Sequence, residues 1–331
     1  MTILITGGTG YIGSHTAVAL LNHGYNVIIA DNLSNSSVSA VTSIKKITGK
    51  DVTFYHVDLS DNLATEKIFR DNHIYAVIHF AGLKANEESV SMPLTYYSNN
   101  VGSALSLLSS MKKYNVDRFV FSSSATVYKG NDIPYKEDMT ISERGNTPYG
   151  CSKAMIEKML TDCAAAVPKL QIVALRYFNP VGAHESGLLN ENPKAVPQNL
   201  MPYLIKVAER KEPFLKIYGN DYDTPDGTCI RDYIHVCDLA EGHIKALENL
   251  KPGMDFINLG SGKGYSVLEI VKAFEKVNNI EIPFRFAPRR SGDLPAFWAD
   301  TEKAKRLLNW ETTRTLSDMM KLRNPDLANN S

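Results

Sequence analysis

A tyrosine and a lysine four positions apart are well suited to proton transfer. They occur in the stretch Tyr149-Gly150-Cys151-Ser152-Lys153, and a helix beginning near Tyr149 would carry both side chains on one face. A free tyrosine has a pKa of about 10. A neighbouring ammonium group, and an oxidised nicotinamide if one binds here, both favour the phenolate, so we expect the pKa of Tyr149 to lie closer to neutral. Such a tyrosine can take the proton of a hydroxyl group while hydride leaves the adjacent carbon.

A serine run adds a third candidate for the same chemistry. Ser122-Ser123-Ser124 ends an apolar segment, and Ser124 could hydrogen-bond the oxygen that Tyr149 deprotonates. Tyrosine and lysine at this spacing also arise by chance in many helices. A second signal is therefore needed, and hydride transfer requires a cofactor that accepts it.

The second signal is the glycine-rich stretch Gly7-Gly8-Thr9-Gly10-Tyr11-Ile12-Gly13, which follows an apolar run and precedes a helical pattern. Gly7, Gly10 and Gly13 would let backbone approach a pyrophosphate, and the following helix would present free N–H groups to it. Such a turn alone is weak evidence, because any strand-to-helix turn can hold glycines. Asp31 follows 24 residues after Gly7 and ends the next apolar run. A carboxylate there can bind a ribose diol and repel a 2′-phosphate, so NAD is favoured over NADP. The alternative for Asp31 is a helix cap.

Two further strand ends fit a dinucleotide. Asp58 closes the third apolar run, where a carboxylate could bind an adenine amino group. Phe80-Ala81-Gly82 closes the fourth, where small residues allow a nicotinamide ribose to approach. Each could be an ordinary strand end, but together they would line the carboxyl edge of one sheet.

The elements that must position these residues alternate between strands and helices. Little alternation within the apolar runs indicates strands buried on both faces, expected at Thr2–Thr6, Asn26–Asp31, Val52–Asp58, Ala76–Ala81, Arg118–Ser123 and Gln171–Tyr177. Helical patterns lie between them, at Ser14–His23, Asn62–Asn72, Thr95–Tyr114 and Tyr149–Ala166. Repeated β-α units predict an α/β fold, a Rossmann-like doubly wound parallel sheet with right-handed crossovers.

The sequence pattern changes after Phe178. Prolines punctuate short elements there, which predicts a smaller, mixed α/β C-terminal lobe that carries substrate contacts. We expect residues 1–178 to bind NAD and residues 179–331 to bind mainly substrate, with some chain crossing back to the sheet.

Composition excludes several classes of function. Lys plus Arg and Asp plus Glu both number 36, so the chain has no electrostatic footprint for nucleic acid. No apolar run approaches the roughly 18 residues of a membrane helix, and the N-terminus lacks a signal-peptide pattern. The four cysteines share no short paired spacing, which favours reduced thiols and a cytoplasmic protein. The eight histidines show no ligand spacing, so no metal site is expected.

The order of these motifs identifies a resemblance. The chain is similar to the extended short-chain dehydrogenases/reductases and, along nearly its whole length, to the UDP-glucose (UDP-galactose) 4-epimerases among them. The stretches that carry the resemblance are Gly7–Thr16, Val77–Ala85, Phe121–Tyr128, Arg176–His184, Asn199–Tyr203, Gly219–Tyr222, Arg231–Val236 and Phe286–Asp300.

The resemblance implies a redox-neutral epimerisation at one sugar carbon. Tyr149 would take the proton of the sugar 4-hydroxyl, NAD would take hydride from C4, and the 4-keto sugar would turn before both return. Lys153 would hold the nicotinamide ribose and tune Tyr149, and Ser124 would assist. Matched by motif, the family's further NAD contacts fall on Tyr11, Ile12, Asp31, Asn32, Asn35, Asp58, Leu59, Lys84, Asn99 and Phe178.

The nucleotide-sugar contacts of the family fall in the second half. Matched by motif, they are Asn179, Asn199, Leu200, Lys216, Ile217, Tyr218, Arg231, Arg290 and Asp293. A diphosphate favours the planar fork of arginine, which singles out Arg231 and Arg290, whereas Arg289 is expected to be a charge outside the site. Simpler readings remain for two members, because Arg231 could pair with Asp232 and Tyr218 could fill a core.

One position bears on the sugar. The resemblance implies that Phe297 helps gate the sugar pocket, and that a bulky aromatic there accompanies plain hexoses while a small residue admits a 2-acetamido group. Departures from the family pattern leave alternatives open, namely Asn86-Glu87-Glu88, the extra Lys129, Cys151, and a C-terminus that ends at Asn324–Ser331 without an aromatic-rich tail. They could mark a 4-epimerase of N-acetylhexosamines, carried on UDP or on a polyprenyl diphosphate. The latter would need peripheral membrane contact.

Rival classes share part of the pattern. A sugar-nucleotide dehydratase or decarboxylase would keep the NAD site, but dehydratases usually place acidic residues where Ala125-Thr126 stands here. A non-catalytic NAD sensor would not need Ser124, Tyr149 and Lys153 together. Family members are commonly homodimers joined through two helices per subunit, for which Thr95–Tyr114 and Tyr149–Ala166 are the candidates.

Overall fold

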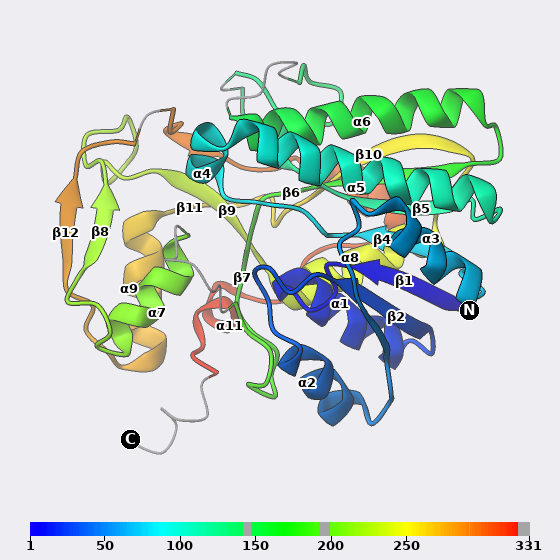
Figure 1. Cartoon of the computed structure of the whole chain (residues 1–331). Coiled ribbons are helices and arrows are strands. Elements are labelled where there is room, and N and C mark those ends of the chain that lie inside the picture. The colour runs from blue at the N-terminus through cyan, green and yellow to red at the C-terminus, as the bar shows by residue number, and fades with distance from the viewer. Residues whose placement is uncertain (131, 142–146, 192–198, 291, 324–331) are drawn as a thin grey trace.

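A parallel sheet forms the centre of the molecule (Figure 1). Within the described residues it has seven strands in the order β10-β6-β5-β4-β1-β2-β3. They are β1 (Thr2–Thr6), β2 (Asn26–Asp31), β3 (Thr53–His56), β4 (Ala76–His79), β5 (Arg118–Ser124), β6 (Gln171–Tyr177) and β10 (Gly253–Leu259). The chain runs outward from β1 through β2 to β3, then returns to β4 on the other side of β1. This reversal creates the crevice in which doubly wound sheets bind ligands.

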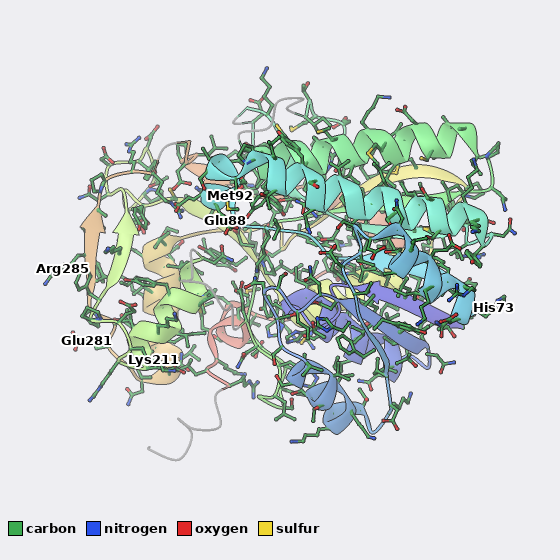
Figure 2. All side chains as sticks on the ribbon, in the orientation of Figure 1. His73, Glu88, Met92, Lys211, Glu281 and Arg285 are labelled. Carbon is green, nitrogen blue, oxygen red and sulfur yellow. The ribbon has the colours of Figure 1, made fainter. Side chains whose placement is uncertain are left out.

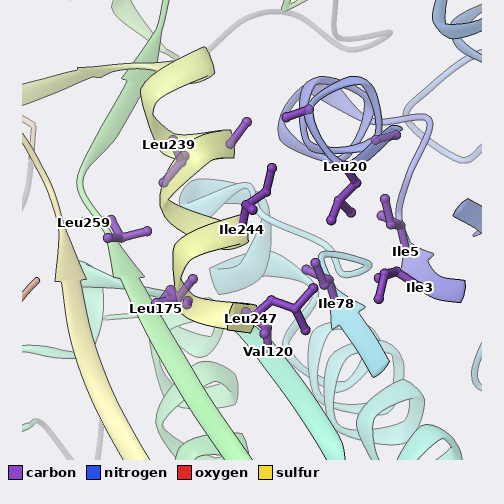
Figure 3. Close-up of a cluster of buried hydrophobic side chains, with 14 of the residues drawn as sticks. Ile3, Ile5, Leu20, Ile78, Val120, Leu175, Leu239, Ile244, Leu247 and Leu259 are labelled. Atoms are coloured by element: carbon purple, nitrogen blue, oxygen red, sulfur yellow. The ribbon is translucent and has the colours of Figure 1, made fainter. Parts of the chain in front are cut away.

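Helices cover both faces of the sheet. One face carries α1 (Tyr11–Asn22), α2 (Ser39–Thr48), α8 (Val236–Glu248) and α10 (Glu302–Leu308). The other carries α3 (Asn62–Asp71), α5 (Pro93–Lys113) and α6 (Pro148–Ala166), with the short α4 (Asn86–Ser91) just before α5. Figure 3 shows Leu239, Ile244 and Leu247 of α8 packed beside Leu20 of α1 over the apolar strand residues. The two apolar layers fix the strands, so the strand ends are rigid places for functional side chains.

A smaller part lies at the carboxyl side of the sheet, on the left in Figure 1. Its two small sheets contain β7 (Asn179–Val181), β9 (Ile230–His235), β11 (Gly264–Ser266) and β13 (Ala296–Phe297), and β8 (Leu215–Tyr218) with β12 (Phe284–Ala287). Its helices are α7 (Leu200–Ala208), α9 (Val267–Asn278) and α11 (Leu316–Met320). These elements share an apolar core of their own.

The sequence-based prediction of a Rossmann-like doubly wound α/β fold is confirmed. The expected strands and helices occur with ends shifted by a few residues, and α1 starts at Tyr11 rather than Ser14. Gly24, with a φ of +85°, follows the C-cap of α1 in the left-handed conformation that ends helices. The sequence did not reveal that β10 becomes the outer strand beside β6, with α8 packed against α1.

The computed structural model describes residues 1–130, 132–141, 147–191, 199–290 and 292–323, so the C-terminal departure Asn324–Ser331 lies outside it. In those ranges no helix has the length and apolarity needed to cross a bilayer. All four cysteines are at described positions, and none of them forms a disulfide there.

Candidate active site

The glycine turn between β1 and α1 leaves no room for side chains. Gly7 has a φ of +68°, and a Cβ there would lie 2.7 Å from the Ala81 nitrogen. A Cβ on Gly13 would lie 2.3 Å from the Gly7 carbonyl oxygen. Gly10 caps α1 without a side-chain hydrogen bond, so N–H groups of the first turn keep no side-chain partner. The turn therefore fits a phosphate-bearing cofactor.

Asp31 holds the loop that faces this turn. Its Oδ2 accepts a hydrogen bond from the Thr9 amide at 3.1 Å, and its Oδ1 accepts one from the Leu33 amide at 2.8 Å and one from Ser36 Oγ at 3.1 Å. The helix-cap alternative is wrong, because α2 begins at Ser39 with Val38 as its N-cap. Asp31 is thus a preoriented acceptor beside the glycine turn.

Asp58 lies just beyond β3, near Asn32. It accepts hydrogen bonds from the Ser60 amide at 2.9 Å, from Ser60 Oγ at 2.7 Å and from Asn32 Nδ2 at 3.3 Å. The Ser60 bonds lower the pKa of Asp58. Asn99 of α5 lines a hollow together with Ser60, which brings Asn99 to the same end of the sheet. The adjacent Leu59 is buried in the core, so its side chain is turned away.

The strand end after β4 is crowded by the Asn100 side chain. Gly82 takes a φ of +157°, and a Cβ there would lie 3.0 Å from Asn100 Oδ1. Buried Asn100 holds this segment, accepting from the Leu83 amide at 2.8 Å and donating to Ser152 Oγ at 3.0 Å. Sequence reasoning missed Asn100, although it directly follows the predicted Asn99. Phe80 and Ala81 are half-buried on the sheet at this point.

Tyr149 and Lys153 lie on one face of the first turns of α6, as predicted. Thr147 caps the helix by accepting a hydrogen bond from the Gly150 amide at 3.3 Å. Lys153 Nζ donates to the Ser122 carbonyl oxygen at 2.7 Å, and it lies 5.9 Å from the centre of the Tyr149 ring. The helix start and the end of β5 therefore bring the two side chains together.

Burial governs the protonation of this pair. It lowers the pKa of Lys153 to about 8, with Glu157 acting in the opposite direction. It raises the pKa of Tyr149, an effect opposed by hydrogen bonding with Ser124. Burial therefore opposes the fall in pKa that the sequence predicts for Tyr149 beside an ammonium group and an oxidised nicotinamide, because burial penalises the charged phenolate.

Ser124 ends β5 and turns the chain into a short 3-10 helix, η1 (Ala125–Val127). Its Oγ accepts hydrogen bonds from the Thr126 amide at 3.2 Å and from Thr126 Oγ1 at 2.9 Å. These bonds orient the Ser124 hydroxyl on the side where Tyr149 lies. The three residues predicted to do chemistry are therefore grouped at the carboxyl end of β5.

Arg231 and Arg290 converge on one carboxylate. Arg231 Nη2 lies 3.6 Å from Asp293 Oδ1, and Arg290 Nε donates to Asp293 Oδ2 at 3.0 Å. Arg231 does not pair with Asp232, which is buried and accepts hydrogen bonds from Ser261 and its neighbours. Two guanidinium groups on opposite sides of an acid form a cationic surface of the kind that binds a diphosphate.

Neighbouring residues divide between site and core. Tyr218 is 40% exposed and lies under the Arg290 guanidinium at 5.0 Å from its ring centre, so it does not fill a core. Lys216 is exposed, whereas the Ile217 side chain is buried, which leaves only the Ile217 backbone for a ligand. Arg289 binds Asp221 instead, Nε to Oδ1 at 2.7 Å, and is a charge outside the converging pair, as expected.

Aromatic rings cluster around Phe297. Phe297 of β13 lies 5.0 Å from Phe178 and 4.5 Å from Tyr135, measured between ring centres. Asn179 follows Phe178 and donates from Nδ2 to the Asp232 carbonyl oxygen at 2.9 Å. Phe297 is half-buried in this cluster, so its ring is held by contacts rather than free to move aside.

Three of the predicted contact residues have polar partners within the protein. Tyr11 donates from its hydroxyl to the Gly182 carbonyl oxygen at 2.6 Å, and Ile12 packs against the core. Lys84 pairs with Glu191, Nζ to Oε1 at 3.1 Å, and Asn199 donates to the same oxygen at 3.3 Å. Leu200 starts α7 and packs on the smaller core, while Asn35 lies in the loop after β2. Glu191, which the sequence did not single out, thus joins the NAD and sugar sets.

The departures from the family pattern lie near the start of α6. Asn86 Oδ1 accepts a hydrogen bond from Thr147 Oγ1 at 2.9 Å, and Glu88 accepts one from the Tyr96 hydroxyl at 2.6 Å. Figure 2 shows Glu88 and Met92 at the end of the α4–α5 segment that faces the smaller part. The Lys129 amide donates to the Thr140 carbonyl oxygen at 3.2 Å. Asn86 is therefore tied to the residue that caps α6.

Comparisons with known proteins agree with this geometry. Residues 3–260 match the profile described as the NAD dependent epimerase/dehydratase family. The UDP-glucose 4-epimerase of Bacillus subtilis (strain 168) is 54% identical over 322 residues, 96% of this chain and 94% of that protein. The structure of UDP-glucose 4-epimerase from Bifidobacterium longum in complex with NAD+ and UDP superposes with a TM-score of 0.93 at 50% identity, over 97% of this chain and 96% of that one.

A more distant structure carries a broader description. The UDP-Glc/GlcNAc 4-epimerase from Campylobacter jejuni gives a TM-score of 0.83 at 34% identity and covers 96% of this chain and 97% of that one. Both structures match nearly the whole chain in fold. The chain therefore belongs to the NAD dependent epimerase/dehydratase family of extended short-chain dehydrogenases/reductases, as a relative of the UDP-glucose 4-epimerases.

Proposed function

We propose that this chain is an NAD-dependent isomerase, a 4-epimerase that interconverts UDP-glucose and UDP-galactose. The observation that carries the proposal is the grouping of Ser124, Tyr149 and Lys153 at one strand end, across the sheet edge from the glycine turn. Relatives named for this reaction are 54% identical, and one of their structures holds NAD+ and UDP.

In the proposed mechanism, one set of residues holds the cofactor and another set moves the proton. The glycine turn and Asp31 would hold NAD, which when bound supplies the acceptor and donor of hydride. Tyr149 takes the proton of the sugar 4-hydroxyl and later returns it. Lys153, charged below about pH 8, stabilises the phenolate form of Tyr149. Ser124 steadies the reacting oxygen by hydrogen bonding.

The two arginines would bind the diphosphate. The Arg231 side chain is fixed by two hydrogen bonds from its Nη1, to the carbonyl oxygens of Ile230 and Leu294, each at 2.8 Å. Arg290 reaches from the loop after β12. The proposal thus assigns NAD to residues 1–178 and the nucleotide-sugar mainly to residues 179–331, with α8 and β10 returning to the sheet. Inversion at C4 requires the sugar to turn while the diphosphate stays anchored there.

Phe297 supports the choice of a plain hexose. Its ring fills space between Phe178 and Tyr135 that a 2-acetamido group would otherwise need. The test is a substrate panel on purified protein, with UDP-galactose, UDP-GalNAc and polyprenyl-diphosphate-linked GalNAc. We expect UDP-galactose to be converted fastest, with no net change in the oxidation state of bound NAD. Conversion of only an acetamido substrate would replace the proposed specificity, and conversion of none would refute the proposed function.

A homodimer through α5 and α6 is part of the proposal. Leu94 and Leu105 of α5 and Met155 of α6 are 81%, 51% and 47% exposed, and large exposed apolar side chains on adjacent helices favour a partner surface. Light scattering should give twice the mass of the chain, and Leu105→Glu should yield a monomer. We also propose a cytoplasmic location, because cysteines that form no disulfide, as in the described residues, are typical of reducing compartments.

A further inference from the structure

The serine run at the end of β5 meets α6 at three successive points. The Ser122 carbonyl oxygen accepts from Lys153 Nζ at 2.7 Å. Ser123 Oγ donates to Glu157 Oε1 at 2.6 Å. Ser124 interacts with Tyr149. The middle contact has no part in the chemistry described so far, although Glu157 stands one helical turn beyond Lys153.

Glu157 is a buried carboxylate whose side-chain hydrogen bonds are made with Ser123 and Arg176. It is 1% exposed, and Arg176 binds it with two parallel bonds, Nε to Oε1 at 3.0 Å and Nη2 to Oε2 at 2.8 Å. Ser123 and Arg176 are directly opposite each other in the β5–β6 ladder. Three elements are therefore tied together at Glu157.

Arg176 is itself fixed on several sides. Its guanidinium lies 4.8 Å from the Tyr128 ring centre and 4.7 Å from that of Phe256. Its Nη1 donates to the Glu137 carbonyl oxygen at 3.2 Å. Stacking, a fork-shaped pair of bonds and a third bond suit arginine and cannot all be made by lysine.

A lysine and a glutamate four residues apart on a helix are natural partners for each other. In a buried site their attraction is strong, because a charge left without a partner there is costly. In this chain the pairing is Glu157 with Arg176, and Lys153 rests instead on the Ser122 carbonyl oxygen, beside the Tyr149 ring.

We propose that Arg176 is a positioning residue for catalysis: by engaging both oxygens of Glu157, it keeps that carboxylate from capturing Lys153 and leaves Lys153 facing Tyr149. Ser123 helps to hold Glu157 in this orientation. The inference rests on the proposed function for its kinetic consequence, whereas its structural consequence is independent of any substrate.

The test is a pair of variants that removes one charge and then both. In Arg176→Met, Glu157 should turn to Lys153, and kcat per folded, NAD-loaded subunit should fall by roughly 100-fold. In the double variant Arg176→Met/Glu157→Gln the competing charge is gone, and kcat should return to within roughly 5-fold of the original. A stabilising role alone would predict no such recovery. Should Arg176→Met fail to fold, Arg176→Lys takes its place, since it keeps the charge but not the fork.

A matched control comes from a second buried acid. Asp238 belongs to α8, away from α6. Its side chain is 3% exposed and pairs with Arg314. Arg314→Met should lower the melting temperature in a similar way, yet leave kcat within roughly 3-fold.

Crystal structures of the variants supply the readout that needs no substrate. In the Arg176 variant, Lys153 Nζ should leave the Ser122 carbonyl oxygen and approach Glu157. Lys153 unmoved in that variant, or a double variant as slow as the single one, would overturn the inference. If the unaltered enzyme converts no sugar, the proposed function fails while the position of Lys153 still decides the inference.

Discussion

The Thr9 amide donates a hydrogen bond to Asp31 Oδ2 across 3.1 Å, and this bond joins the glycine turn to the end of β2. Thr9 Oγ1 also lies 2.7 Å from Ser36 Oγ, and Ser36 in turn donates to Asp31 Oδ1. The turn that would receive the pyrophosphate and the acid that would receive the ribose are thus parts of one hydrogen-bonded unit. Disturbing Asp31 should affect both.

Asp31→Asn should weaken NAD binding by about 1.5–3 kcal/mol, the usual worth of hydrogen bonds to a charged group. The amide would also turn an N–H toward backbone donors, and the preference for NAD over NADP should shrink because a charge that repels the 2′-phosphate is lost. Calorimetric titration of both nucleotides checks this. Asp61→Asn is the matched control, since Asp61 caps α3, and it should change NAD affinity less than 2-fold by rough estimate. Unchanged discrimination in Asp31→Asn would contradict the assignment.

Tyr149→Phe should lower kcat by roughly 10²–10⁴-fold, the contribution typical of a positioned acid–base group. The side chain loses only its hydroxyl, so bound NAD and thermal stability should change little. Tyr55→Phe offers a matched control, because the Tyr55 hydroxyl also accepts a hydrogen bond, from Asn72 Nδ2. Tyr55 belongs to β3, an edge strand of the sheet away from β5. Coupled assay of epimerisation, with NAD content measured on the same samples, makes the comparison. Full activity in Tyr149→Phe would exclude the proposed proton transfer.

The sequence predicted the parts of this molecule that depend on local pattern. Strands such as Asn26–Asp31 have an apolar centre because both of their faces are buried, and the Gly7–Gly13 turn is forced by backbone contacts. The i, i+4 spacing of Tyr149 and Lys153 fixed their shared face as soon as the helix began at Pro148.

Partners far apart in sequence could not be predicted in the same way. Lys84 and Glu191 are 107 positions apart, and Glu157 meets Arg176 only because β6 lies beside β5. That burial raises the pKa of Tyr149 could not be predicted for a related reason, since this burial depends on the whole fold. The sequence pattern indicates which face of a helix or strand a residue occupies, but not how completely other elements cover that face.

Arg290→Ala should raise the KM for the nucleotide-sugar at least about 10-fold, because it removes one of two guanidinium groups from the proposed diphosphate site. Its neighbour gives an unusually close control. Arg289→Ala removes the same charge from the same loop, but Arg289 is engaged by Asp221 and the Tyr222 ring. It should change KM less than about 3-fold. Equal effects of the two substitutions would indicate a general effect of charge and not a diphosphate contact.

The pH profile should have an alkaline limb with a midpoint near 8. Burial lowers the pKa of Lys153 to about 8, so the ammonium is present below this pH and is lost above it. Since the charged form favours the Tyr149 phenolate, kcat/KM should fall as the pH rises from about 7 to about 9. In Lys153→Arg the side chain stays charged at any pH that the fold tolerates, and whatever activity remains should lack this limb. A midpoint still near 8 in that variant would assign the limb to another group.

Phe297→Ser should shift the enzyme toward acetamido sugars. Removing the ring opens the space between Phe178 and Tyr135, whose centres lie 5.0 Å and 4.5 Å from that of Phe297. Because Phe297 is only half-buried, the loss of stability should stay below the roughly 3–5 kcal/mol seen for fully buried phenylalanines. The ratio of kcat/KM for UDP-GalNAc to that for UDP-galactose should rise at least about 10-fold. The reason is that a steric block of a few atoms is worth about 1–3 kcal/mol. Phe286→Ser, which removes an exposed ring at the far side of the smaller part, should leave this ratio unchanged. An unaltered ratio in Phe297→Ser would show that another side chain decides which sugars enter.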